Sequence, residues 1–250
     1  MLYDERLQPL NQSRDPMSDQ PLFYQAIVPL NRDTHRQLRL ARSAPCAFAA
    51  GSHLIPAVMD EFPSACGDLP ILYAINADGP SPVFLTSLTP GHNSFVTALG
   101  TWSGLYVPAY VRRYPFILGD VAGADSLICI DEQSTLWRVG DGSAALFHAD
   151  GSPAAPLAER IQLVTDFAAS AKRTQAMGQL LLELRLLKPV TIQTKSAVGT
   201  IDGLLRIDEA ALNALSSADF LRLRADGMLG AIYTHLVSLR AIDRLSQAAG

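Results

Sequence analysis

One stretch of the chain, GTWSGLYVPAYVRRYPF at residues 100–116, gathers several side chains that could recognise a ligand. Four rings that carry hydrogen-bonding groups and two guanidinium groups lie within fifteen residues there. Flat rings stack on planar groups, phenol hydroxyls form hydrogen bonds, and a guanidinium fork binds carboxylates and phosphates. The stretch therefore predicts a surface for a sugar, an anion or the backbone of a partner protein. Its candidate ligand-binding residues are Trp102, Tyr106, Tyr110, Arg112, Arg113 and Tyr114.

The geometry of this stretch decides which of these side chains act together. If Leu105–Arg112 is extended, Tyr106, Tyr110 and Arg112 share one face. If the chain turns helical instead, Arg112 and Arg113 point to different sides. A purely structural role is also open, with the rings at the core edge and an arginine stacked on tyrosine. Because an uncompensated guanidinium is costly to bury, we expect one arginine to brace the fold and the other to face an opening.

A second candidate site joins His53 and Glu61, which lie close together in sequence at the start of a predicted helix. The alternative for both is an ordinary role in a loop or a helix cap. None of the five histidines lies within four residues of another, so the spacing predicts no local metal pair and we expect no metal.

Known catalytic and nucleotide-binding motifs are not found. The pattern G-x-G-x-x-A at residues 140–145 is not followed by the helix that a dinucleotide site requires, and it is interpreted as hairpin chemistry. The sequence contains neither a P-loop nor HExxH. We therefore expect no cofactor, and the sequence leaves open whether the protein is an enzyme.

Charge and cysteine content narrow the class of protein. The chain has 20 basic and 24 acidic residues, a formal net charge of −4, which is unlike a nucleic-acid binder. The exception is a short basic cluster, Arg32, Arg36, Arg39 and Arg42. Three widely spaced cysteines without CxxC are typical of a reducing compartment, so we expect a cytoplasmic protein.

No stretch is typical of a membrane span or a secretory signal. The uncharged run at residues 95–111 contains glycines and a proline, and we expect it not to cross a membrane. The first 20 residues are polar and lack an apolar core. We expect residues 1–20 to be a disordered tail, with either Met1 or Met17 as the start, and residues 21–250 to form a single domain.

The order of elements predicts an α+β fold. Apolar residues recur at steps of three and four from Leu157 to Leu187, which predicts one long amphipathic helix ended by Pro189. Short strands separated by turn signals precede it, and two strands and a helical end follow. We expect an antiparallel or mixed sheet packed against the long helix, with a helical C-terminal end.

The individual elements are predicted as follows. Strands are expected at residues 23–30, at 69–76 and 81–88 as a hairpin, at 126–131, 135–139 and 144–148 as a meander, and at 190–194 and 204–207. Helices are expected at residues 33–42, 55–66, 209–215 and 228–247, with a further helical piece that starts at Ser216 and ends at Gly227.

Three stretches of the chain resemble the bacterial SapC family. They are FYQAIVPLNRDTH near the start, WSGLYVPAYVRRYPF after FLTSLTPGHNSF, and GLLRIDEAALNALSSADFLRLRADGMLGAIYTHLVSL near the end. The resemblance runs from about residue 23 to 239 and implies a SapC-like domain. The family is named for an association with a bacterial surface layer, and its members tend to accompany outer-membrane nutrient receptors. The resemblance carries over no catalytic residues.

Two functions follow from these observations. The first is a soluble, non-catalytic accessory or binding protein of the SapC family, with a protein partner or a small polar or anionic ligand. The alternative is an enzyme acting on a sugar or peptide, with the Trp102–Phe116 segment lining its site. A deep pocket joining an arginine of that segment to a histidine and a carboxylate would favour the enzyme. A shallow surface or an apolar patch would favour the binding protein.

Overall fold

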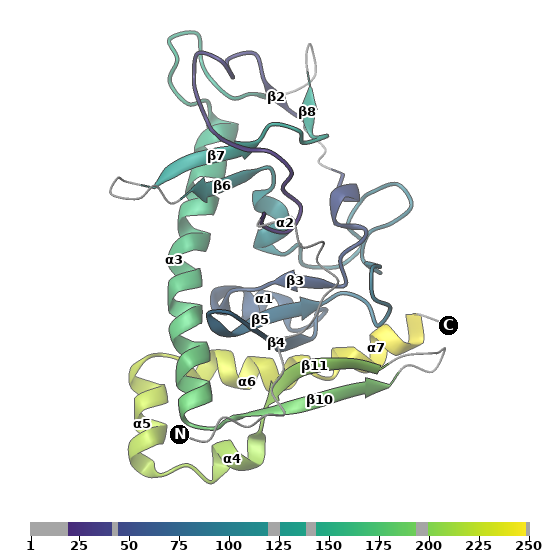
Figure 1. The fold of residues 1–250 in the computed structure, drawn as a ribbon, viewed down its shortest axis with the longest axis vertical. Coiled ribbons are helices and arrows are strands. Elements are labelled where there is room, and N and C mark those ends of the chain that lie inside the picture. The colour runs from purple at the N-terminus through teal and green to yellow at the C-terminus, as the bar shows by residue number, and fades with distance from the viewer. Residues whose placement is uncertain (1–19, 42–44, 120–125, 139–143, 194–199, 249–250) are drawn as a thin grey trace.

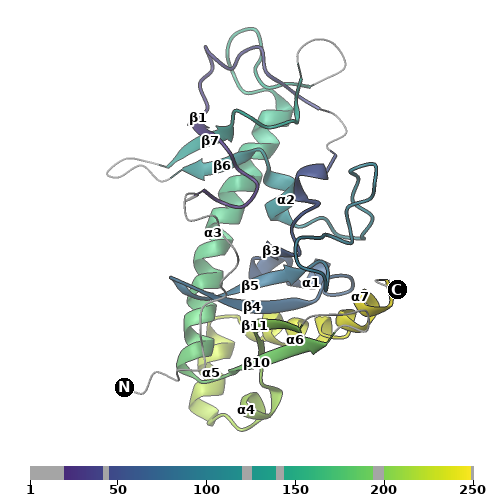
Figure 2. The same cartoon turned by 45° about the vertical axis from the view of Figure 1, so that its right-hand side comes forward.

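The computed structural model describes residues 20–41, 45–119, 126–138, 144–193 and 200–248. It has both helices and antiparallel sheets, which confirms the predicted α+β class. A helix of 29 residues, α3 (Ala155–Glu183), runs alongside two of the sheets (Figures 1 and 2). Apart from Gln20, the predicted tail lies outside the described residues.

Three separate sheets replace the single sheet that was expected. The first has the order β1 (Ile27–Pro29), β7 (Leu127–Asp131), β6 (Phe116–Gly119). The largest has the order β10 (Leu187–Gln193), β11 (Thr200–Ile207), β4 (Ile71–Asn76), β5 (Gly79–Leu85), β3 (Leu54–Pro56). The smallest has the order β8 (Trp137–Arg138), β2 (Arg39–Leu40), β9 (Ala144–Ala145).

The remaining elements are short helices between the strands and a helical C-terminal end, which was expected. Those between the strands are the 3-10 turns η1 (Ala47–Ala49) and η2 (Met59–Glu61), with α1 (Phe62–Ala65) and α2 (Ala109–Arg113). The C-terminal helices are α4 (Glu209–Asn213), α5 (Ser217–Ala225), α6 (Leu229–Ser238) and α7 (Ala241–Ala248).

Local signals predicted several elements correctly. The β4–β5 hairpin closes where Asn76 pairs with Gly79, whose φ of 104° suits glycine. Asp208 caps α4 by accepting from the Ala210 amide at 3.1 Å, and Ser216 caps α5. Gly227, with a φ of 68°, follows α5 directly after its C-cap residue.

Other predictions were wrong where distant pairing outweighed local pattern. The meander at residues 126–148 does not form, because β8 and β9 flank β2 while β7 pairs with β1 and β6. The helix expected at 33–42 is replaced by a turn, in which the Asn31 side chain accepts from the amides of Asp33 and Thr34, and by β2.

Two predicted helices were too long. In the segment 55–66, Ile55 pairs with Phe84 in the largest sheet, so the α-helical part is only α1. The segment 228–247 divides into α6 and α7 at Leu239 and Arg240.

The long helix is shorter than predicted at its C-terminal end. It ends at Glu183, and Arg185 takes a φ of 55°, which reverses the chain into β10. Pro189 therefore lies within an edge strand rather than at the end of a helix. Leu184, which falls in the apolar period predicted from Leu157 to Leu187, is the C-cap and only half-buried.

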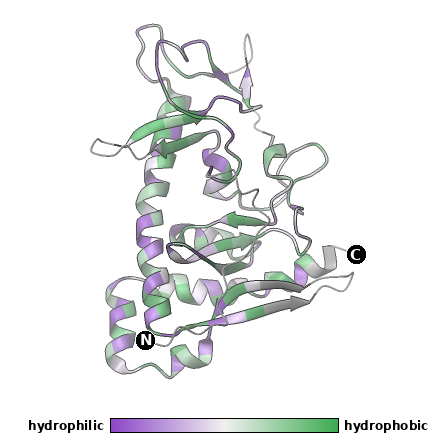
Figure 3. Cartoon of the chain, in the orientation of Figure 1, coloured by the Kyte–Doolittle hydropathy of each residue, from purple (hydrophilic) through white to green (hydrophobic). Residues whose placement is uncertain are grey.

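Helix α3 links the two larger sheets. It alternates hydrophilic and hydrophobic residues, while strands beside it are largely hydrophobic (Figure 3). Its N-terminal half packs against β6 and its C-terminal half against β5. At Gly178 a Cβ atom would lie 2.1 Å from the Pro80 carbonyl oxygen, so a glycine is required for the helix backbone to contact β5.

Replacing Leu181 by alanine should lower the free energy of unfolding by about 2–5 kcal/mol, because this fully buried side chain fills the core between α3 and the largest sheet. Denaturant midpoints measure the effect. Leu182→Ala, at a neighbouring side chain that is 40% exposed, is the matched control and should change stability by only about 0.5 kcal/mol. Equal losses in both variants would show that the buried face of α3 is assigned wrongly.

Candidate functional site

The aromatic and arginine segment is extended only as far as Pro108. Pro108 has a ψ of 140°, and α2 follows at once, so the shared face predicted for Tyr106, Tyr110 and Arg112 is not formed. The helical alternative holds. Arg112 is exposed and Arg113 is buried, and consecutive residues of a helix point about 100° apart.

Arg113 is the bracing arginine. Its side chain is 8% exposed and its guanidinium carbon lies 4.0 Å from the ring centroid of Tyr110, 4.5 Å from that of Phe167 and 5.8 Å from that of Tyr24. These rings come from α2, α3 and the segment before β1. Ring faces attract a desolvated cation, so they offset part of the cost of burying this charge.

Arg112 is the exposed arginine, and it lies beside Tyr106 although the two share no extended strand face. Its Nη2 donates to the Tyr106 hydroxyl at 3.1 Å, its Nε donates to the Val107 carbonyl oxygen at 2.9 Å, and its guanidinium carbon lies 5.6 Å from the Tyr106 ring centroid. The Tyr106 hydroxyl in turn donates to Glu61 Oε1 at 2.9 Å. The structure therefore joins three predicted site residues in one chain of hydrogen bonds.

Glu61 is a buried carboxylate whose two oxygens both accept hydrogen bonds. Oε1 accepts from Tyr106 and from the amide of Ala109 at the start of α2, and Oε2 accepts from the Val58 amide at 3.3 Å. Burial raises the pKa of the Glu61 carboxyl, and these hydrogen bonds offset part of that shift. Burial also raises the pKa of Tyr106 to about 12, and the Glu61 carboxylate adds to the increase.

His53 does not share a site with Glu61. Its Nδ1 accepts from the Gly91 amide at 3.3 Å, and burial lowers the pKa of its imidazole. The hydrogen bonds of Glu61 run to residues near η2 and α2 instead. In the described part of the chain no contact joins the two, so this pairing is not formed.

Trp102 and Tyr114 have structural partners. The Trp102 ring stacks on Phe95 at 5.3 Å between centroids, with an interplanar angle of 13°. The buried Tyr114 hydroxyl donates to Asp131 Oδ2 at 2.9 Å. Asp131 is fully buried, and its Oδ1 also accepts from the Ala26 amide at 2.9 Å. Sequence reasoning missed Asp131, because its partners lie up to 106 residues away and no local motif marks it.

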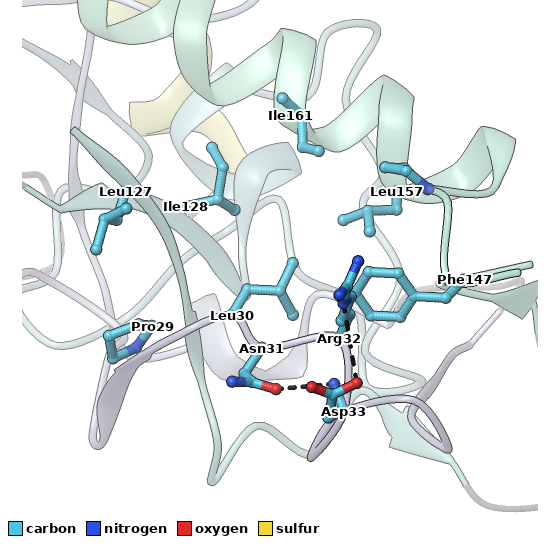
Figure 4. A pocket seen from close by; sticks show the side chains of 12 residues that line it. Pro29, Leu30, Asn31, Arg32, Asp33, Leu127, Ile128, Phe147, Leu157 and Ile161 are labelled. Carbon is cyan, nitrogen blue, oxygen red and sulfur yellow. Dashed lines mark hydrogen bonds and ion pairs between the residues drawn. The ribbon is translucent and has the colours of Figure 1, made fainter. Parts of the chain in front are cut away.

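A groove that sequence reasoning did not predict lies between β1, β7 and the N-terminal end of α3 (Figure 4). Its volume is about 420 Å³, and we call it the β1–α3 groove. The apolar side chains that line it include Leu30, Ile128, Phe147, Leu157 and Ile161, and the polar ones are Asn31, Arg32 and Asp33.

A second groove of about 510 Å³ lies among α4, α5 and α6. Its apolar lining residues are Leu212, Leu215, Phe220, Leu221 and Tyr233. Two of them, Leu221 and Tyr233, are roughly half exposed, at 53% and 47%. We call it the α4–α6 groove.

The described residues hold neither a candidate metal site nor a candidate membrane span. Among them, no group of three or more His, Cys, Asp or Glu side chains could hold a metal ion. Within the same residues, no helix is both long and apolar enough to cross a membrane.

The two arginines should respond differently to replacement by methionine, which keeps apolar bulk and removes the charge. Arg113→Met should lower the free energy of unfolding by about 2 kcal/mol, since three ring contacts to a desolvated cation are lost. Arg112→Met, the matched control, should change it by only about 0.5 kcal/mol. Denaturant midpoints decide the matter, and a larger loss for Arg112→Met would reverse the two assignments.

Glu61 should make stability depend on pH. Because its folded-state pKa lies above the usual value of 4.5, the folded chain holds this proton more tightly than the unfolded chain. The resulting stabilisation is fully present below pH 4.5 and is lost as the pH rises through the folded-state pKa. The stability of wild type relative to Glu61→Gln should therefore fall across that range in denaturant titrations. The exposed Glu159→Gln should show no such trend, and a rising difference for Glu61→Gln would contradict the assigned shift.

The sequence profile of one family, SapC, matches residues 30–245. This match covers most of the chain, including the aromatic and arginine segment, all the residues that line the β1–α3 groove except Pro29, and all the helices up to α6. Comparison with curated proteins and with solved structures gives no match. The extent of the profile match agrees with the three stretches that carried the resemblance, and the chain belongs to the SapC family.

Proposed function

We propose that this protein is a non-catalytic accessory protein that binds a ligand or a protein partner at the β1–α3 groove. The observation that carries the proposal is the groove itself. It opens between β1, β7 and α3 and is lined by apolar side chains such as Ile128 and Ile161, with its polar side chains in one short segment. Concave, mostly apolar sites with a few polar groups are typical of ligand binding.

The contacts made by the side chains in and around the aromatic and arginine segment also support binding rather than catalysis. Glu61 uses both oxygens to hold η2, Tyr106 and the start of α2 in place. Arg113 is enclosed by rings. The alternative of an enzyme acting on a sugar or peptide needs these groups free to reach a substrate, and their contacts commit them to packing.

We also propose that the protein is cytoplasmic and serves the bacterial cell surface. Membership of the SapC family supports a link to the bacterial surface layer or to outer-membrane receptors, as the family name and its usual neighbours imply. Within the described residues Cys46, Cys66 and Cys129 form no disulfide bond, which supports a cytoplasmic location, since thiols persist in reducing compartments. The net charge of −4 supports a partner other than nucleic acid.

The test is complementation in a bacterium whose own copy of the gene has been deleted. The readouts are surface-layer assembly and receptor-dependent uptake. Ile161→Trp, which fills the groove with a larger side chain, should fail to restore the lost phenotype while keeping the melting temperature of the wild type. Leu182→Trp, on the exposed side of the same helix, is the matched control and should restore it.

Arg112→Met distinguishes the two functions. If the protein acts through the β1–α3 groove, this variant should complement fully, because Arg112 lies outside the groove. A folded Arg112→Met variant that fails, together with an Ile161→Trp variant that succeeds, would move the function to the aromatic and arginine segment. A deletion that alters neither readout would overturn the link to the cell surface.

A further inference from the structure

Helix α6 turns hydrogen-bonding side chains toward the core. His235 and Ser238 are both fully buried. The His235 Nε2 atom accepts from the amide of Ile207 on β11 at 3.0 Å. The Ser238 Oγ atom accepts from the amide of Ile71 on β4 at 3.0 Å. Burial lowers the pKa of His235 to about 3, so its imidazole is neutral at ordinary pH. The inner side of this helix therefore uses polar groups to hold two strands of the largest sheet.

The outer side of α6 is apolar instead. Tyr233 is 47% exposed, and Val237, one turn further along the helix, is 55% exposed. No Asp, Glu, Lys or Arg occurs anywhere in residues 227–239. A surface helix normally places charged residues on its outer side, and a helix that is apolar all round is normally buried. The outer side of α6 therefore has the composition of a surface that is covered.

This apolar side continues into the α4–α6 groove, which Tyr233 and the half-exposed Leu221 of α5 both line. Val237 lies one turn along α6 from Tyr233, outside the groove. We call this groove, together with Val237, the α6 face. It offers a hollow of about 510 Å³ and, beside that hollow, an exposed apolar side chain. The three helices lie together at the end of the molecule away from β1 (Figures 1 and 2).

The charges around the α6 face balance one another. Residues 209–240 contain three acidic and three basic side chains, Glu209, Asp219, Asp226, Arg222, Arg224 and Arg240. The rest of the chain keeps 17 of the 20 basic and 21 of the 24 acidic residues, so the whole net charge of −4 lies outside this segment. Copies of the chain therefore repel each other on average, but not where two such segments meet. A partner of strong positive or negative charge is not selected there either.

A surface that holds both a hollow and an exposed apolar side chain can pack against a copy of itself. In a two-fold dimer the same patch is used by both subunits, so each contact between two residues forms twice. Val237 of each copy can then enter the groove of the other and cover Leu221 and Tyr233. The balanced charges around the face meet these same requirements, because each acidic side chain of one copy can find a basic one of the other.

We propose that the α6 face is the interface between two copies of this chain. The two α6 helices lie side by side about a two-fold axis, and Val237 of each copy enters the α4–α6 groove of its partner. There it contacts the exposed side chains of Leu221 and Tyr233. The interface does not depend on the proposed function, because the β1–α3 groove lies at the other end of α3.

Sedimentation velocity of the full chain over a wide range of concentrations measures the association. Wild type should approach twice the mass of one chain and rise no further, because a two-fold interface closes on itself. Val237→Arg should weaken the dimer at least about tenfold, since it places a charge in an apolar groove. Leu99→Arg is the matched control. It places the same charge on a leucine that is 85% exposed between β5 and α2, and it should leave the dimer unchanged.

A mixture of two variants tests whether the contact is reciprocal. Ser217→Trp blocks the groove from an exposed position in its lining and should weaken the dimer as Val237→Arg does. When the two variants are mixed, they should associate more strongly than either does alone. The mixed dimer keeps one complete contact, in which the unaltered Val237 of one chain enters the open groove of the other. Each dimer of identical variants keeps none.

Several outcomes would overturn the proposal. A wild-type chain that stays monomeric at every concentration would assign the α6 face to a different occupant, and association that continues beyond the dimer would exclude a closed two-fold interface. Equal association of wild type and Val237→Arg would show that the copies meet elsewhere. A mixture that associates no better than its separate variants would show that Val237 does not enter the groove. Circular dichroism checks that each variant folds, and Tyr233→Arg, at the other exposed residue of α6, replaces Val237→Arg if that variant does not.

Discussion

The buried guanidinium of Arg113 is the constraint on which the rest of the structure depends. The chain builds one apolar cluster around the largest sheet and another around the β1–β7–β6 sheet, and Arg113 lies between them. Tyr110 and Phe167 belong to the first cluster and Tyr24 to the second. A cation at that junction is tolerated only when ring faces surround it, so α2, α3 and the segment before β1 must all converge there.

Glu61 completes this junction from the other side of α2. It accepts from the first amide of α2 and from Tyr106, and Tyr106 is joined to Arg112. Glu61, Tyr106 and Arg113 were candidate site residues in the sequence. In the structure their contacts mainly fix the position of α2 between the two sheets. The groove that we propose for binding is lined mainly by ordinary apolar side chains, among them Leu30 and Ile161, together with Asn31, Arg32 and Asp33.

Sequence reasoning succeeded where the determinant is local. The turn between β4 and β5, the caps at Asp208 and Ser216, and the periodic pattern of α3 each depend on residues within a few positions of one another. It also predicted that only one of the two arginines would be buried, but not that this would be Arg113 or that aromatic rings would surround it. It could not find the groove, since Leu30, Ile128 and Ile161 meet only through pairing of β1 with β7 and the packing of α3.

The length of α3 sets the distance between the two grooves of the molecule. Leu157 and Ile161, near its start, line the β1–α3 groove, while Glu183, at its end, is bonded to Arg222 of α5, the helix that contributes Phe220 and Leu221 to the α4–α6 groove. At a rise of about 1.5 Å per residue, these ends are about 40 Å apart. Molecules placed at the two ends of α3 would therefore not touch each other.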